Sequence, residues 1–176
     1  MATETCVLGG GCFWCLDATF RLVEGVETVV CGYAGGHDPA PRYEAVCRGE
    51  TGHAEVVEIT FDPEVIGFRE LLTIFFALHD PTTLNRQGND VGTQYRSAIY
   101  TLNDAQLEEA RRMVAALTED YESPIVTEVR PLEAFHPAEA YHQDYFTKNP
   151  GNAYCQLVIP PKRHKLAQRF AHRLKG

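Results

Sequence analysis

A cysteine between a glycine run and two aromatic residues is the part of this sequence best suited to chemistry. Residues 9–15 read Gly-Gly-Gly-Cys-Phe-Trp-Cys and follow the short apolar stretch 6–8. Three glycines suit a tight passage from a strand to a helix, and a helix beginning there points free N–H groups at Cys12. Such groups favour the thiolate, the form of cysteine that attacks. We predict that Cys12 is a nucleophile with Phe13 and Trp14 as an apolar wall beside it.

Cys15 leaves a second interpretation open. Cys12 and Cys15 have the CxxC spacing of thiol-disulfide oxidoreductases, in which one thiol attacks and the other resolves. A CxxC pair alone would leave the other polar clusters of the chain without a role. The chain has six cysteines. Because a reducing compartment keeps structural thiols reduced, we expect some to be catalytic, and we predict that Cys6 and Cys31 are passive core residues.

Three loop segments accompany the cysteine motif. They are residues 32–36 (Gly-Tyr-Ala-Gly-Gly), 51–55 (Thr-Gly-His-Ala-Glu) and 86–97 (Arg-Gln-Gly-Asn-Asp-Val-Gly-Thr-Gln-Tyr-Arg-Ser). With these segments, and with Lys-Asn-Pro and Tyr-Cys near the end, the chain resembles the type A peptide methionine sulfoxide reductases. The resemblance implies reduction of the S epimer of methionine sulfoxide, free or in proteins, with thioredoxin restoring the thiols and with no cofactor. It also implies a ferredoxin-like two-layer α/β sandwich with an extended, loop-rich C-terminal region.

The resemblance further implies a role for each polar residue. The sulfoxide oxygen must be protonated as the thiolate attacks, and Glu55 matches the catalytic glutamate if burial raises its pKa towards neutrality. Tyr33 and Tyr95 match the two tyrosines that donate hydrogen bonds to the oxygen. Asp90 is expected to orient a water or a tyrosine. His53 is expected to support Glu55 and to help bind substrate.

The same resemblance assigns the methyl pocket and the resolving cysteine. Phe13 and Trp14 would receive the S-methyl group of the substrate. After attack Cys12 is a sulfenic acid, which condenses with a nearby thiol. Cys155 occupies the position of the family's first recycling cysteine, and we predict that it closes the disulfide from a mobile loop of glycine, asparagine and proline. No cysteine follows Cys155, so thioredoxin must act on this first disulfide; Cys15 ranks second as the resolver.

The hydrophobic pattern predicts the elements that position these residues. It predicts strands near residues 6–8, 26–33, 56–61, 97–100 and 126–130, and helices near 16–24, 68–78, 103–121 and 162–175. This order is typical of an α+β chain with helices packed on one mainly antiparallel sheet. We expect residues 1–176 to form one domain.

Charge and composition narrow the class of protein. A formal net charge of −8 argues against general nucleic-acid binding, because phosphate contacts need a positive face. No apolar run reaches the length of a membrane span and no secretory signal begins the chain, so we expect a cytoplasmic monomer without membrane contact. The histidines and cysteines lack the spacing of a zinc site, and we expect no metal. A sulfoxide-binding protein without activity is the alternative outside enzymes.

Overall fold

The structure is a computed structural model that describes residues 2–175. Its strands are β1 (Glu4–Gly9), β2 (Val26–Ala34), β3 (Ala54–Phe61), β4 (Arg86–Gln87), β5 (Asp90–Val91), β6 (Ala98–Thr101), β7 (Glu128–Pro131) and β8 (Phe135–Pro137). Its α-helices are α1 (Phe13–Phe20), α2 (Tyr43–Cys47), α3 (Phe68–Leu78), α4 (Asp104–Leu117), α5 (Tyr145–Lys148) and α6 (Ala153–Phe170). Short 3₁₀ turns include η1 (Thr93–Tyr95) and η3 (Ala140–His142).

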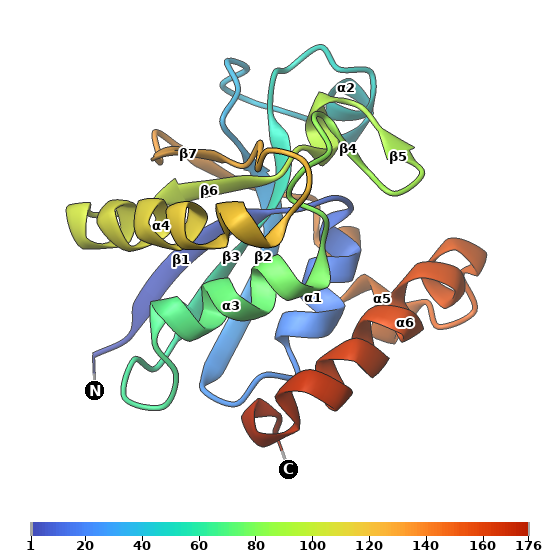
Figure 1. Cartoon of the computed structure of the whole chain (residues 1–176). Helices are drawn as coiled ribbons and strands as arrows, with labels where there is room; N and C mark the ends of the chain where they lie inside the picture. Colours follow the sequence, from blue (N-terminus) through green and yellow to red (C-terminus); the bar gives the residue numbers. More distant parts are fainter. Residues whose placement is uncertain (1, 176) are drawn as a thin grey trace.

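The main sheet has the order β7-β6-β1-β3-β2-β8, and β4 pairs with β5 separately (Figure 1). All neighbours in the main sheet are antiparallel except β6 and β7. Helix α1 connects β1 to β2, and α3 lies between β3 and β6. In the β2–β3 register Tyr33 is opposite Glu55. Because directly opposed residues project from the same face of a sheet, these two side chains share one side.

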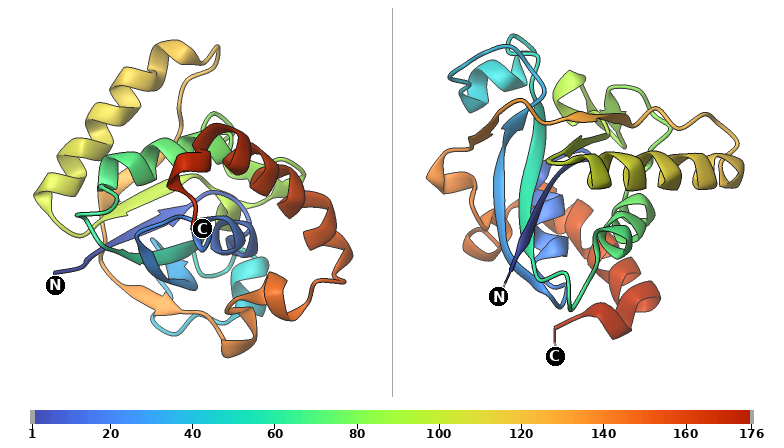
Figure 2. Two further views of the ribbon diagram at one scale, coloured as in Figure 1. Left: turned by 90° about the horizontal axis from the view of Figure 1, so that it is seen from below. Right: turned by 90° about the vertical axis from the view of Figure 1, so that its left-hand side faces the viewer.

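Helices α1, α3, α4 and α6 lie on one face of the sheet (Figures 1 and 2). The main core lies between this helical layer and the sheet, and it includes fully buried Phe13, Ile59 and Phe75. A smaller cluster on the opposite face contains Tyr100 and is covered in part by Phe135. The Cys12 turn therefore lies on the helical side, where side chains from several elements can meet.

The predicted α+β class and the order of the main strands and helices are confirmed. Five elements were not predicted: α2, β4, β5, β8 and α5. All five have five residues or fewer, too few for hydrophobic periodicity to be recognised. Among residues 2–175, no helix combines the length and the apolar character needed to cross a bilayer.

The segment around Cys155 differs from the prediction. A mobile loop was expected there, but α6 begins at Ala153 and continues through Pro160 and Pro161. Asn152 caps this helix, because its side chain accepts a hydrogen bond from the Cys155 N–H (3.0 Å). Proline removes a helical hydrogen bond and normally ends a helix. Packing of α6 against α1 and the main core stabilises the helix in spite of the two prolines.

Two basic residues of α6 donate hydrogen bonds to neighbouring helices. Arg163 donates to the carbonyl of Ala18 at the end of α1 (3.0 Å). Lys162 donates to the carbonyl of Leu78 at the end of α3 (2.7 Å). These contacts give carbonyls at two helix C-termini the positive partners that they favour. Helix α6 therefore links α1 and α3 through these two hydrogen bonds.

Candidate active site

The Cys12 turn is a tight strand-to-helix passage, as predicted. Cys12 is the N-cap residue of α1, with an extended backbone, and is 8% exposed. Gly11 has a φ of +91°, a conformation that glycine adopts without strain. A Cβ at Gly11 would lie 2.8 Å from the side chain of Gln87. The glycine thus allows the loop around Gln87 to approach Cys12 closely.

Cys12 and Cys15 interact through their thiols. The Cys15 N–H donates to the Cys12 carbonyl (3.1 Å), which places Cys15 one turn along α1. Burial raises the pKa of Cys12 well above its usual range, and the contact with Cys15 adds to this, although the Trp14 N–H acts in the opposite direction. A hydrogen bond from Cys12 lowers the pKa of Cys15. The predicted N–H effect is present, but burial outweighs it at Cys12, whereas the contact with Cys12 favours the thiolate of Cys15.

Glu55 is a buried carboxyl at the centre of the site. It is 1% exposed, and burial raises its pKa to about 8. Its Oε1 accepts a hydrogen bond from the Phe13 N–H (3.1 Å), while its Oε2 has no partner among residues 2–175. In its ionised form it adds to the rise in the pKa of Cys12, and it does the same for Tyr33 and Tyr95, where burial is the main cause. Glu55 is thus protonated near neutral pH and lies within electrostatic reach of all three groups.

The two tyrosines differ in their hydrogen bonds. The Tyr33 hydroxyl donates to Oε1 of Glu139 (2.8 Å), and Oε2 of Glu139 accepts from the Tyr43 N–H (3.0 Å). Tyr95, in η1, has no hydroxyl partner within the described residues. Glu139 was not identified from the sequence. It precedes the Ala-Tyr-His turn η3 in a segment predicted only as loop, and no local pattern links it to Tyr33.

An aromatic cluster surrounds the start of α1. The Trp14 ring stacks on Tyr145 (centroids 3.9 Å apart, planes 7° apart), and its Nε1 donates to Nδ1 of His142 (3.0 Å). The Phe13 ring lies 5.1 Å from His142 and 6.4 Å from Tyr43. Phe13 and Trp14 are thus held in one apolar wall, as their sequence types suggest. His142, Tyr43 and Tyr145 are further members that the sequence reasoning missed.

Asp90 and Tyr154 close another side of the site. The Tyr154 hydroxyl donates to Oδ2 of Asp90, and the ring of Tyr154 lies edge-on to Trp14 (6.4 Å). Asp90 belongs to the β4–β5 hairpin, whereas Tyr154 is in the first turn of α6. The tyrosine that Asp90 contacts is therefore neither of the two that the sequence resemblance singled out.

His53 lies against the loop that follows β2. Its Nε2 contacts the carbonyl of Asp38 (2.7 Å), and its Nδ1 accepts from the Gly36 N–H (2.9 Å). Burial lowers its pKa. Because these backbone groups occupy both ring nitrogens, His53 positions this loop, and its role in substrate binding stays a prediction.

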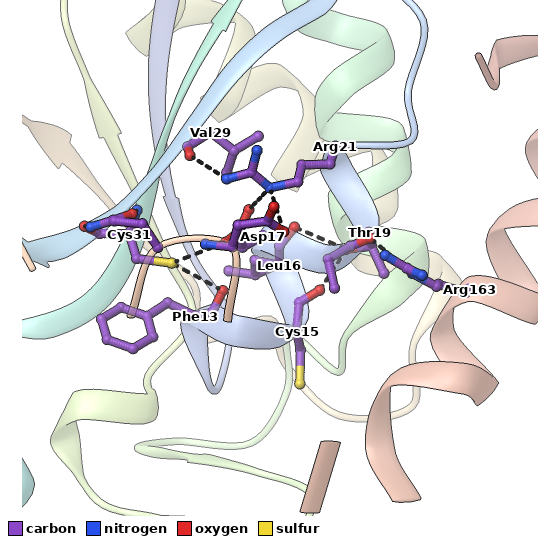
Figure 3. A network of polar contacts seen from close by, with 12 residues as sticks. Phe13, Cys15, Leu16, Asp17, Thr19, Arg21, Val29, Cys31 and Arg163 are labelled. Atoms are coloured by element: carbon purple, nitrogen blue, oxygen red, sulfur yellow. Dashed lines mark hydrogen bonds and ion pairs between the residues drawn. The ribbon is translucent and has the colours of Figure 1, made fainter. Parts of the chain in front are cut away.

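A buried polar network fixes α1 beneath the site (Figure 3). Asp17 accepts hydrogen bonds from Arg21 (2.6 Å) and from the Asp144 N–H (2.9 Å). The Cys31 thiol lies 3.7 Å from both Asp17 Oδ2 and the Phe13 carbonyl. Burial raises the pKa of Cys31, which therefore remains a thiol in the core, as predicted. The sulfur of Cys15 points away from this network (Figure 3).

Cys155 is fully buried in the first turn of α6. Burial raises its pKa to about 11, and Cys15 adds to the rise. Cys47, in α2, is the exposed cysteine of the described chain. Within residues 2–175, no three or more histidine, cysteine, aspartate or glutamate side chains are grouped so that they could hold a metal ion.

Residues 4–174 match the family described as Peptide methionine sulfoxide reductase. This match spans almost the whole chain, which belongs to that family. The chain is 56% identical over 175 residues to Peptide methionine sulfoxide reductase MsrA of Chromobacterium violaceum, covering 98% of this chain and 99% of that protein. It is 60% identical over 159 residues to the protein of the same name from Nautilia profundicola, covering 90% of this chain and 91% of that protein.

Solved structures give the same result. The fold is similar to Mxr1 from Saccharomyces cerevisiae in reduced form, with a TM-score of 0.82, 38% identity, and coverage of 87% of this chain and 89% of that one. It is also similar to Mxr1 in complex with Trx2, with a TM-score of 0.59, 28% identity, and coverage of 81% and 84%.

Proposed function

We propose that this chain reduces L-methionine (S)-S-oxide, free or in proteins, with Cys12 as the nucleophile and Glu55 as the proton donor. Membership of the methionine sulfoxide reductase family carries the reaction class. The observation that supports the assignment of residues is the state of Glu55. This carboxyl has a pKa of about 8, and its Oε2 has no hydrogen-bond partner within the described chain. A neutral acid with a free oxygen beside a buried thiol fits protonation of a sulfoxide.

The proposed step balances without an external oxidant. The Cys12 sulfur attacks the sulfur of the sulfoxide while Glu55 protonates the sulfoxide oxygen. Transfer of this oxygen leaves Cys12 as a sulfenic acid and releases methionine, so Cys12 is oxidised by two electrons and the substrate is reduced by two. The proton that the Cys12 thiol loses restores the acid form of Glu55.

The other site residues bind and orient the sulfoxide in this proposal. Tyr33 and Tyr95 donate hydrogen bonds to the oxygen, where negative charge develops. Phe13 and Trp14 receive the S-methyl group, and an apolar pocket beside polar oxygen donors distinguishes the epimers. Asp90 acts through Tyr154, whose hydroxyl donates a hydrogen bond to the Asp90 carboxylate. His53 supports the site by holding the loop after Tyr33.

The setting of the reaction extends this proposal. The order β6-β1-β3-β2, with α1 and α3 between strands, supports a ferredoxin-like two-layer sandwich. The continuous main core supports one domain over residues 1–176. Thioredoxin is the proposed reductant, which the Mxr1 complex with Trx2 supports. A cytoplasmic monomer that needs no cofactor remains our expectation.

An assay with separated epimers tests the reaction class. With dithiothreitol as reductant, we expect turnover of the S epimer of methionine sulfoxide and none of the R epimer, because the methyl wall and the oxygen donors lie on fixed sides of Cys12. Chiral chromatography of the remaining sulfoxide measures this directly. Binding of the S epimer without release of methionine would instead favour the sulfoxide-binding alternative.

Removal of both tyrosine hydroxyls tests the proposed oxygen site. We expect Tyr33→Phe and Tyr95→Phe each to reduce kcat/KM, and the double variant to lose more. A hydrogen bond to a charged group contributes roughly 1.5 to 3 kcal/mol, and groups that act together need not be additive. Steady-state kinetics on the S epimer gives the measurement. Wild-type turnover by the double variant would exclude both hydroxyls from this role.

Regeneration of Cys12 requires a second thiol, for which there are two candidates. Cys155 as the resolver remains the prediction from the family resemblance. Its burial in the capped first turn of α6 means that a bond to Cys12 needs a local rearrangement. Cys15 already contacts Cys12 within α1.

A further inference from the structure

Lys162 is a half-buried cation without an ion-pair partner. Its ammonium donates to the Leu78 carbonyl (2.7 Å). None of the salt bridges found among residues 2–175 involves Lys162. A carbonyl satisfies one donor but does not neutralise the charge, and a charge removed from water without a counter-ion is costly. An anion in the surroundings of Lys162 would offset this cost.

A cavity joins Lys162 to the two thiols. It has a volume of about 340 Å³, and its lining includes Cys12, Cys15, Asp90, Tyr154 and Lys162. The cavity lies between α1, the β4–β5 hairpin and α6. Cys15 is the thiol that points away from the network beneath α1 (Figure 3). The candidates for an anion near Lys162 are therefore the carboxylate of Asp90 and the thiolates.

The charges around Cys15 favour its thiolate. The hydrogen bond from Cys12 lowers the pKa of Cys15 most, and the Lys162 ammonium lowers it further, against burial and the Asp90 charge. Burial lowers the pKa of Lys162, while Cys15 and Asp90 raise it. The Tyr154 hydroxyl already donates to Asp90. These contacts leave Lys162 free to stabilise negative charge on Cys15.

We propose that Lys162 is a positioning residue that holds Cys15 as a thiolate, and that this thiolate resolves the sulfenic acid on Cys12. The inference rests on the proposed function, which supplies the sulfenic acid. The Cys15 sulfur attacks the Cys12 sulfur, the S–S bond forms, and the S–O bond of the sulfenic acid breaks. The oxygen leaves as hydroxide and becomes water on protonation. The substrate sulfoxide is the only oxidant required.

The geometry of α1 permits this bridge. Residues three apart in an α-helix have Cα atoms roughly 5 Å apart, within the range of disulfides. Cys12 is the N-cap residue and has an extended backbone, so its side chain can adjust without disruption of the helical hydrogen bonds. A disulfide at this position lines the cavity, where a thiol reductant can reach it.

Single-turnover kinetics with charge-changing variants test the inference. Lys162→Met and Lys162→Gln should each release one equivalent of methionine at the wild-type rate, but should close the disulfide about 10-fold more slowly near neutral pH. At a pH below the pKa of Cys15, a rise of one unit in that pKa reduces the thiolate fraction by this factor. The pH profile of disulfide closure should move by about one unit to higher pH. Lys162→Arg should restore closure, and exposed Lys165→Met is the matched control on the same helix.

Peptide mapping of the oxidised wild-type protein completes the test. We expect a Cys12–Cys15 bridge as the first product. Closure at the wild-type rate in both Lys162→Met and Lys162→Gln, or a first bridge from Cys12 to Cys155 or Cys47, would overturn the inference. Failure of wild-type protein to release methionine would instead contradict the proposed function itself. The two failures are thus distinguished by whether methionine appears.

Discussion

Replacement of Cys12 by serine is expected to abolish turnover and leave the fold intact. Serine has nearly the same size, and Cys12 is 8% exposed at the N-cap of α1, where serine is also a preferred residue. A hydroxyl at this position cannot form a sulfenic acid, so both methionine release and disulfide formation should disappear. Quantification of methionine in a single turnover, with circular dichroism as a check on folding, measures the effect.

Cys6→Ala provides the matched control for this experiment. Cys6 is also buried on the helical side of the sheet, in β1, and burial raises its pKa. It lies outside the proposed chemistry, so the variant should still release one equivalent of methionine. Stoichiometric release by Cys12→Ser would show that another group attacks the sulfoxide.

Glu55→Gln is expected to reduce kcat/KM by roughly 10²- to 10⁴-fold, the range typical of general acid catalysis. Glutamine keeps the size of the side chain and can still accept the Phe13 N–H, but it lacks an acidic proton. The free Oε2 of Glu55 is the atom proposed to meet the sulfoxide. Kinetics on the S epimer measure the loss, and wild-type activity at neutral pH would exclude Glu55 as the acid.

The pH dependence of activity gives an independent test of Glu55. Because the acid form is the reactive one and its pKa is about 8, the contribution of Glu55 to kcat/KM should fall as the pH rises through about 8. The Glu55→Gln variant should lack this fall. Glu58→Gln on the same strand is the matched control, because Glu58 is half-exposed and lies an odd number of residues away, on the opposite face. It should retain the wild-type profile.

Burial of Glu55 also makes the free energy of unfolding depend on pH. Its pKa is raised from 4.5 to about 8 in the folded protein, so the folded state holds a proton that the unfolded state has released between these values. The unfolding free energy therefore falls as the pH rises through this window. One pKa unit corresponds to about 1.36 kcal/mol. As the pH rises from 4.5 to 9, the unfolding free energy of Glu55→Gln should therefore increase by roughly 3 to 6 kcal/mol relative to that of the wild type. Urea titrations across this range measure the difference.

The sequence by itself determined the α+β class and the main strands and helices, and it predicted a nucleophile at the Cys12 turn. These features have local signals, because helices and strands repeat their apolar residues at fixed periods and glycine marks backbone that other residues strain. The motif around Glu55 likewise gave its candidate role before its burial was known.

The tertiary structure alone decided which groups meet at the site. Tyr33 and Glu139 are 106 positions apart, and Trp14 and His142 are 128 apart. No periodic pattern encodes such pairs. Cys155 was expected on a mobile loop, but packing of α6 buries it and places Lys162 in the same cavity as Cys12 and Cys15. The physical reason is that burial, which sets the pKa of Glu55 and the charge balance of the two thiols, depends on neighbours from distant segments.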